Sequence, residues 1–218
     1  WQLMAVWLVL IAGGAAAFFS LEHFGHAISG MSNHIVWGFP HVIAIFLIVA
    51  ASGVLNVASI ASVFARTEYK PYAPLSAWMS IAFLVGGLAV LVLDLGKPDR
   101  LIVAMTHFNW TSMFAWNVLL YTGLLGLALL YLWTMYDKRM TRYTTAAGTA
   151  VFLWRLILTS GTGLIFGFLV GREGYGTALL APAFLALSFA CGWALFLLAQ
   201  EGLATWAREP SVALDDFL

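Results

Sequence analysis

The sequence predicts an all-α fold, a polytopic bundle of transmembrane helices, and two features of its composition predict this. Of its 218 residues, 62% are hydrophobic and 9% are charged, and the mean hydropathy is +0.93. Ordinary soluble domains carry about 25% charged residues. The apolar residues also form continuous runs, which favours membrane helices over the alternating strands of a membrane β-barrel.

Six apolar stretches are long enough to cross a bilayer, which takes about 20 mostly apolar residues per helix. We therefore expect a transmembrane domain over residues 1–200 and a polar surface tail over 201–218. The chain begins at Trp1 without a methionine and ends on this polar tail, so we expect it to be truncated from a larger bundle. The expected spans are 2–20, 35–64, 73–93, 112–135, 148–170 and 177–200.

Charge and cysteine content argue against two classes of function. The formal net charge is zero, so nothing indicates a nucleic-acid partner, which would be bound by a basic surface. The one cysteine, Cys191, lies in an apolar run, as expected for a small buried residue. An iron–sulfur cluster usually needs four thiolates, so we expect none in this chain.

Two of the spans carry residues typical of contacts between membrane helices. Gly163, Gly167 and Gly171 recur every four residues along the fifth span, the spacing that lets a neighbouring helix approach closely. The second span carries four polar side chains that we expect to hydrogen-bond to other helices: Ser52, Asn56, Ser59 and Ser62.

The most informative stretch is residues 94–116, between the third and fourth spans. Gly96 can close a helix in a left-handed cap and Pro98 cannot continue that helix, which places Asp94 at the last turn of a membrane helix. Arg100 and Trp110 follow at the boundary between lipid and water. A proton acceptor, a cation and aromatic rings at this boundary suit a redox headgroup that gains or loses protons.

The loops between the spans predict the orientation of the chain. Six basic residues fall on one side and three on the other, and the positive-inside rule places the richer side in the cytoplasm. Both ends of the chain, the N-terminus included, would then be cytoplasmic. The six are Arg66, Lys70, Lys138, Arg139, Arg142 and Arg208, and the three are Lys97, Arg100 and Arg172.

The opposite, periplasmic face gathers many ionisable side chains, including all five histidines. Side chains in ordinary loops would scatter over both faces, so this clustering is the strongest functional indication in the sequence. The cluster consists of Glu22, His23, His26, His34, His41, Asp94, Asp99, Arg100 and His107.

We interpret this cluster as a quinone site. Oxidation of a quinol releases two protons with two electrons, and histidine suits proton transfer because its ordinary pKa of about 6.5 lies near working pH. The candidates for proton transfer at the ring are His26, His41, Asp94 and His107. The candidates for binding the headgroup by stacking or charge are Trp37, Phe39, Arg100 and Trp110. The candidates for a proton path are Glu22 and Arg155, and no metal ligands are expected.

Two of these residues have alternative interpretations. Asp94 would equally cap its helix or pair with Arg100. Arg155 lies inside the fifth span, where it either snorkels to the cytoplasmic surface or belongs to a proton path.

Residues 94–98, Asp-Leu-Gly-Lys-Pro, resemble the Asp-Leu-Gly-Arg-Pro signature of the NrfD/PsrC (polysulfide reductase membrane subunit) family. Lys97 stands where many members have arginine, which keeps the charge. Residues 33–41 and 50–64 resemble one branch of this family, DsrP, the membrane subunit of the Dsr sulfur-metabolism complex. Members have eight to ten spans, more than the six found here.

The resemblance implies a membrane subunit without haem or an iron–sulfur cluster, in a multi-subunit oxidoreductase of the cell inner membrane. Such a subunit exchanges electrons between exchangeable menaquinone or ubiquinone and a periplasmic ferredoxin-like iron–sulfur subunit. The chain would thus be the quinone-reactive part of an enzyme of sulfur metabolism.

Two other functions remain open from the sequence alone. A haem-b anchor needs two histidines from different helices facing one cavity, and His26 or His41 together with His107 would supply them. A secondary transporter typically has broken helices and polar residues at the bilayer midplane, of which Asn56 is a weak example.

Overall fold

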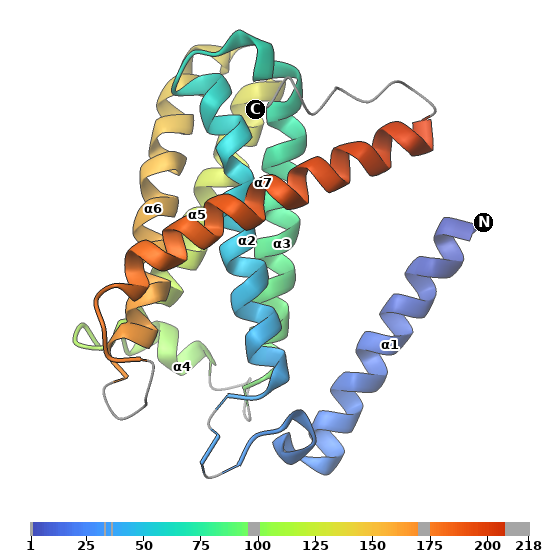
Figure 1. The fold of residues 1–218 in the computed structure, drawn as a ribbon, viewed down its shortest axis with the longest axis vertical. Helices are drawn as coiled ribbons and strands as arrows, with labels where there is room; N and C mark the ends of the chain where they lie inside the picture. The colour runs from blue at the N-terminus through green and yellow to red at the C-terminus, as the bar shows by residue number, and fades with distance from the viewer. Residues whose placement is uncertain (1, 33, 36, 96–100, 170–174, 208–218) are drawn as a thin grey trace.

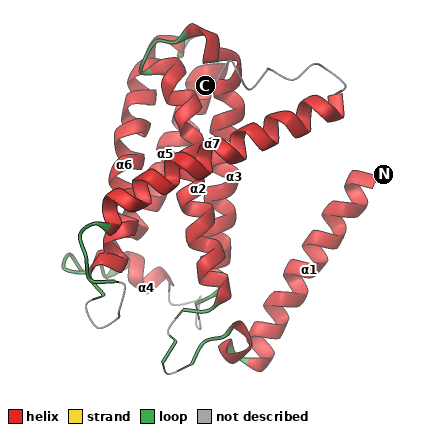
Figure 2. Cartoon of the chain, in the orientation of Figure 1, coloured by secondary structure: helices red, strands yellow, loops and turns green. Residues whose placement is uncertain are grey.

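The computed structural model describes residues 2–32, 34–35, 37–95, 101–169 and 175–207, and all regular structure within them is helical (Figures 1 and 2). Six helices are long and apolar enough to cross a membrane, so the predicted helical membrane bundle is confirmed. They are α1 (Gln2–Phe24), α2 (Phe39–Ser62), α3 (Ala73–Leu93), α5 (Met113–Tyr136), α6 (Thr144–Gly167) and α7 (Leu180–Ala207). The shorter elements are η1 (His26–Ser29), η2 (Thr67–Tyr72), α4 (Leu101–Thr106) and η4 (Thr141–Tyr143).

Several boundaries differ from the expected spans. Helix α2 begins at Phe39 and not at 35, since Pro40 occupies its first turn, where a missing N–H leaves no hydrogen bond unmade. Helix α6 begins at Thr144, four residues before the expected 148. Helix α7 continues past 200 to Ala207, so the first part of the expected polar tail is helical. The rest of the tail and the expected cap at Gly96 lie outside the described residues.

Helix α2 forms the centre of the bundle and packs against α3, α6 and α7 (Figure 1). Its carbonyl groups accept hydrogen bonds from neighbouring helices in addition to those within the helix. The hydroxyl of Ser76 in α3 donates to the carbonyl of Val54 at 2.7 Å. The hydroxyl of Tyr131 in α5 donates to the carbonyl of Ala58, also at 2.7 Å. These bonds fix α3 and α5 in register with α2.

Most of the polar side chains of α2 bond across to other helices, as expected. Ser59 is the exception, and the prediction for it was wrong. Its hydroxyl donates to the carbonyl of Leu55 in its own helix at 2.8 Å, the local bond that serine in a helix often makes. The pairs between helices are Ser52–Thr159, Asn56–Arg155 and Ser62–Tyr131, each 2.6 Å between the bonded atoms.

The glycine stripe of α6 faces the chain that leads into α7. A Cβ added to Gly163 would lie 2.6 Å from the carbonyl oxygen of Leu180, and one added to Gly167 would lie 2.9 Å from that of Thr177. These distances leave no room for a side chain, so the predicted packing role is confirmed for both glycines. Gly171 lies outside the described residues.

The bundle has two distinct ends (Figure 1). The η2 end carries η2 and η4, and the basic residues of the loops between α2 and α3 and between α5 and α6 lie there. The α4 end carries α4, the start of α2 and the end of α3. Helix α1 stands apart from the bundle, makes its main contacts with η1, and ends on the side of the α4 end.

Candidate functional site

A cavity of about 470 Å³ lies at the α4 end, among α2, α3, α4 and α5. This volume is typical of sites for small organic ligands, which usually have mostly apolar walls and a few polar groups. The apolar lining residues include Ile45, Leu88, Leu91, Val92, Leu101 and Ile165. The polar lining residues are His41, Asp94, Asn117, Tyr121 and Thr122.

Two of the predicted site residues, His41 and Asp94, face each other at this cavity. The Nδ1 atom of His41 lies 3.4 Å from Oδ2 of Asp94, and the two side chains are 13% and 6% exposed. His41 lies in the first turn of α2, and Asp94 is the residue directly after α3. Because α2 and α3 run antiparallel, the start of one helix meets the end of the other, and the carboxylate faces the imidazole.

The indole of Trp37 stacks on the imidazole of His41. The two rings are nearly parallel, at 3°, and their centroids lie 5.1 Å apart. Phe166 of α6 packs edge-on against Trp37 at 5.1 Å. The next residue, Gly38, has no space for a Cβ, which would lie 2.6 Å from the carbonyl oxygen of Ser29 in η1. Glycine at this position lets η1 pack against the start of α2, next to Trp37.

Helix α5 supplies polar lining residues that were not predicted. Asn117 is 1% exposed, and its amide donates to the carbonyls of Met113 at 2.9 Å and Gly161 at 3.4 Å. The hydroxyl of Thr162 donates to the side-chain oxygen of Asn117 at 3.3 Å. These bonds hold the amide at the cavity wall. An asparagine within a predicted membrane span was the available signal, since buried polar groups in a membrane usually have a role.

Three of the residues predicted to act at or bind the headgroup do not line the cavity. Phe39 is 69% exposed, because a residue two positions before His41 points to the other side of a helix. Trp110 is 67% exposed and packs with Phe108 and Trp116. His107 is exposed, and its Nδ1 lies 3.1 Å from the hydroxyl of Thr106. These three side chains therefore lie away from the cavity that His41 and Asp94 line.

Arg100 and the side chain of His26 lie outside the described residues. Glu22 is exposed on α1 and does not line the cavity. Among the described lining residues, His41 is the only histidine, whereas an axial pair for haem would need two.

Arg155 is buried at the middle of α6, with 1% of its surface exposed. Its Nη2 donates to the side-chain oxygen of Asn56 at 2.6 Å, and its Nη1 donates to the carbonyl of Ser52 at 3.2 Å. The guanidinium also lies over the rings of Phe152 and Phe189, at 4.9 and 5.0 Å. Because these contacts hold the side chain between helices, the alternative in which Arg155 snorkels to the surface is wrong.

This arrangement predicts an asymmetry between two substitutions. Asn56→Leu should destabilise the protein by about 2–3 kcal/mol, because the buried guanidinium of Arg155 loses its side-chain acceptor. Adding Arg155→Met should recover most of this loss, since an apolar pair can replace a buried polar one at little cost. Unfolding in mixed micelles measures the two single variants and the double variant. A double variant whose loss equals the sum of the single losses would contradict this prediction.

Comparison with known proteins places the chain in a family. Residues 27–211 match the family model described as polysulphide reductase, NrfD. The chain is 31% identical over 198 residues to the Hdr-like menaquinol oxidoreductase integral membrane subunit of Archaeoglobus fulgidus, covering 90% of this chain and 50% of that protein. It is 30% identical over 213 residues to a candidate dimethyl sulfoxide reductase membrane subunit of Halobacterium salinarum, covering 87% and 48%.

A third relative, a selenate reductase subunit of Mesobacillus selenatarsenatis, is 20% identical over 153 residues, covering 70% of this chain and 36% of that protein. No solved structure matches the chain significantly. The chain spans about half the length of the two more similar relatives.

The fold and cavity define a multi-span membrane protein of helical type, with an ionisable pair at one end of the bundle. The chain belongs to the polysulphide reductase NrfD family.

Proposed function

We propose that this chain is the quinone-reactive membrane subunit of an oxidoreductase complex, and that the cavity at the α4 end binds the quinone headgroup. The observation that carries this proposal is the His41–Asp94 pair on the wall of an apolar cavity near one end of the bundle. The family and the menaquinol oxidoreductase named among its relatives support it.

The lining of the cavity fits a quinone ring. Its two oxygens lie at opposite positions of the ring, so a binding site needs polar groups on two sides. The His41–Asp94 pair comes from α2 and α3, and Asn117, Tyr121 and Thr122 come from α5. The ring of Trp37 and the aliphatic side chains between these groups suit the apolar faces of a headgroup.

The geometry indicates how the chain would handle protons. A bound quinol supplies two electrons and two protons. With the Nδ1 hydrogen of His41 directed at the Asp94 carboxylate, 3.4 Å away, Nε2 would accept the two quinol protons one at a time and pass the first on before it takes the second. The carboxylate of Asp94 holds the imidazole in this orientation and stabilises the imidazolium that forms. In the reverse direction the same pair returns protons to the ring.

The electrons need an acceptor in another subunit. An iron–sulfur cluster usually takes four cysteine thiolates, and this chain has one cysteine. We assign this role to a periplasmic ferredoxin-like subunit that docks at the α4 end. We further place the complex in the cell inner membrane and in sulfur metabolism, as for DsrP. The chain's N-terminus and the basic loops of the η2 end would be cytoplasmic. The quinone would be menaquinone or ubiquinone.

Photolabelling with an azido-quinone on membranes that contain the assembled complex tests the site. We expect labelled peptides from the start of α2 and from α5 around residues 117–122, with labelling abolished by excess unlabelled quinone. Ile45→Trp, which fills the cavity, should remove most of the labelling. Val42→Trp is the matched control, since Val42 is 62% exposed on the same helix. Labelling confined to the η2 end would refute the proposed site.

Arg155 offers a continuation of the proton path into the bundle. Thr162 bonds to Asn117 at the cavity, and Thr159, one turn away in α6, bonds to Ser52 beside Arg155. Such buried polar chains in membranes often conduct protons. An Arg155→Met variant that keeps the wild-type number of protons moved per electron would argue against this role. Glu22 has no described contact with these groups.

A further inference from the structure

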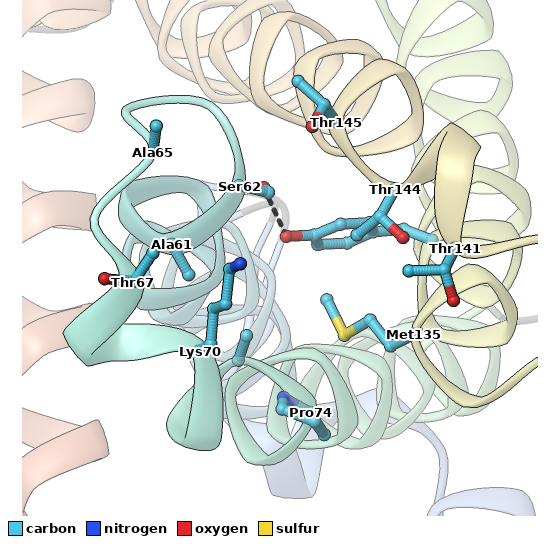
Figure 3. Close-up of a pocket in the computed structure, with 12 residues that line it drawn as sticks. Ala61, Ser62, Ala65, Thr67, Lys70, Pro74, Met135, Thr141, Thr144 and Thr145 are labelled. Carbon is cyan, nitrogen blue, oxygen red and sulfur yellow. Dashed lines mark hydrogen bonds between the residues drawn. The ribbon is translucent and has the colours of Figure 1, made fainter. Parts of the chain in front are cut away.

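A second cavity, of about 380 Å³, lies at the η2 end of the bundle. It is bounded by η2, the end of α2, the start of α3, the end of α5 and the start of α6 (Figure 3). The proposed quinone chemistry takes place at the opposite end and makes no use of it.

The polar groups of this second cavity are a cation and several hydroxyls. Figure 3 shows Lys70 extending from η2 with its amine directed into the cavity, on the side of the hydrogen bond between Ser62 and Tyr131. Thr67, Thr144 and Thr145 also line the walls, and no acidic residue is among the described lining residues. An ammonium group with hydroxyl donors, in a lining without a carboxylate, is suited to binding an anion.

The surroundings of the cavity are also positively charged. The two loops at this end, residues 63–72 and 137–143, contain five basic residues and two acidic ones, an excess of three positive charges. A local excess of this kind raises the concentration of anions near the surface. Basic loops next to membrane helices attract anionic lipids in the same way.

Neighbouring aromatic residues place this cavity at the level of a membrane interface. The indole nitrogen of Trp78 in α3 donates to the hydroxyl of Tyr136, the last residue of α5, at 3.2 Å. Both side chains are exposed, by 52% and 62%. Exposed tryptophan and tyrosine are typical of the headgroup region of a bilayer. An anion held by Lys70 would therefore lie at the depth of lipid phosphates.

The other walls of the cavity are apolar and include Ala61, Ala73, Pro74 and Met135. A free inorganic ion would gain nothing from contact with these apolar walls, whereas the glycerol and upper acyl chains of a lipid would pack against them. We infer that this cavity binds a phosphate-bearing anion through Lys70, and that the anion is the headgroup of an anionic phospholipid. This inference does not depend on the quinone site.

Binding measurements on the complex, stripped of lipid by detergent exchange, test this inference. Phosphatidylglycerol, phosphatidylcholine and inorganic phosphate are titrated separately, with the thermal midpoint and native mass spectrometry as readouts. We expect phosphatidylglycerol to bind and to raise the midpoint more than the other two. Lys70→Gln should weaken its binding about fivefold, the effect of one basic residue near an anionic lipid. Adding Thr145→Val to Lys70→Gln should weaken the binding of phosphatidylglycerol further.

Lys138→Gln is the matched control, because Lys138 belongs to the same basic end and does not line the cavity. Its loss of affinity for phosphatidylglycerol should be clearly smaller than that of Lys70→Gln, because Lys138 contributes only to the general positive charge of this end. Equal losses in Lys70→Gln and Lys138→Gln, or equal binding of phosphatidylglycerol and phosphatidylcholine, would overturn the site. Binding of inorganic phosphate that depends on Lys70 and matches phosphatidylglycerol would support the anion site and overturn its assignment to a lipid.

Discussion

Replacing His41 by alanine should lower quinol-dependent electron transfer by about 100-fold or more, the usual contribution of a general acid–base group. In the proposed site the imidazole accepts a proton from the quinol, and alanine leaves the ring hydroxyl without a proton acceptor. The substitution removes a side chain that is 13% exposed at the end of the bundle, so the complex should still assemble. Turnover with a soluble quinol measures the first effect, and the stoichiometry of the purified complex measures the second.

Asp94→Asn separates the role of the carboxylate from that of the imidazole. Asparagine keeps the shape of the side chain, but its amide no longer stabilises a charged His41 or fixes which ring nitrogen carries the hydrogen. We expect turnover to fall about tenfold or more. His23→Ala is the matched control, since His23 is an exposed histidine on α1 at the same end. Wild-type turnover in both His41→Ala and Asp94→Asn would exclude the proposed site.

The number of membrane-spanning helices could be predicted from the sequence because the thickness of a bilayer fixes the length of a spanning helix. Helix ends were harder, since they depend on local chemistry that an apolar run hides. Pro40 lies in the first turn of α2, so the helix begins later than the apolar run suggests. Helix α4 has only six residues, too few to show a helical pattern in the sequence. The extension of α7 to Ala207 includes Glu201, whose charge made the stretch resemble a surface tail.

The two residues that meet at the candidate site could be predicted in part. His41 and Asp94 were recognisable because ionisable residues at the ends of apolar runs are few. Whether two such residues meet depends on which helices pair, and the antiparallel contact of α2 with α3 decides this. Phe39 was predicted to bind the headgroup, but it lies two residues from His41 and faces away from the cavity, which the sequence pattern did not reveal. The burial of Arg155 could not be predicted from α6 alone, because it depends on the hydrogen bond to Asn56 of α2.

The crossing of α2 and α7 is the contact most sensitive to a small change. A Cβ added to Gly53 would lie 2.7 Å from the carbonyl carbon of Ser188 and 2.9 Å from the Cα of Gly192. The two helices therefore touch backbone to backbone, as small residues allow in membranes. Beyond the crossing, Phe196 of α7 is fully buried against Val54 and Val57, so α7 cannot move away without exposing this side chain.

Gly53→Val should consequently destabilise the protein by about 3 kcal/mol or more, at the upper end of what overpacking costs. Gly126→Val is the matched control, because a Cβ at Gly126 of α5 meets no atom within 4 Å, and its effect should be close to zero. Unfolding by sodium dodecyl sulfate in mixed micelles, followed by helical circular dichroism, compares the two variants. Equal stability of both would show that the helices do not cross at Gly53.

The same substitution should also reduce quinol turnover, through a chain of aromatic contacts. Phe184 of α7 stacks on Phe166 of α6 with ring centroids 5.3 Å apart, and Phe166 packs edge-on against Trp37. If α7 shifts, Phe166 loses this neighbour and Trp37 is less firmly held against His41. Because the proposed proton-accepting pair, His41 and Asp94, is itself untouched, Gly53→Val should lower the affinity for quinol more than the maximal rate. His41→Ala should show the opposite pattern, with the larger loss in the maximal rate.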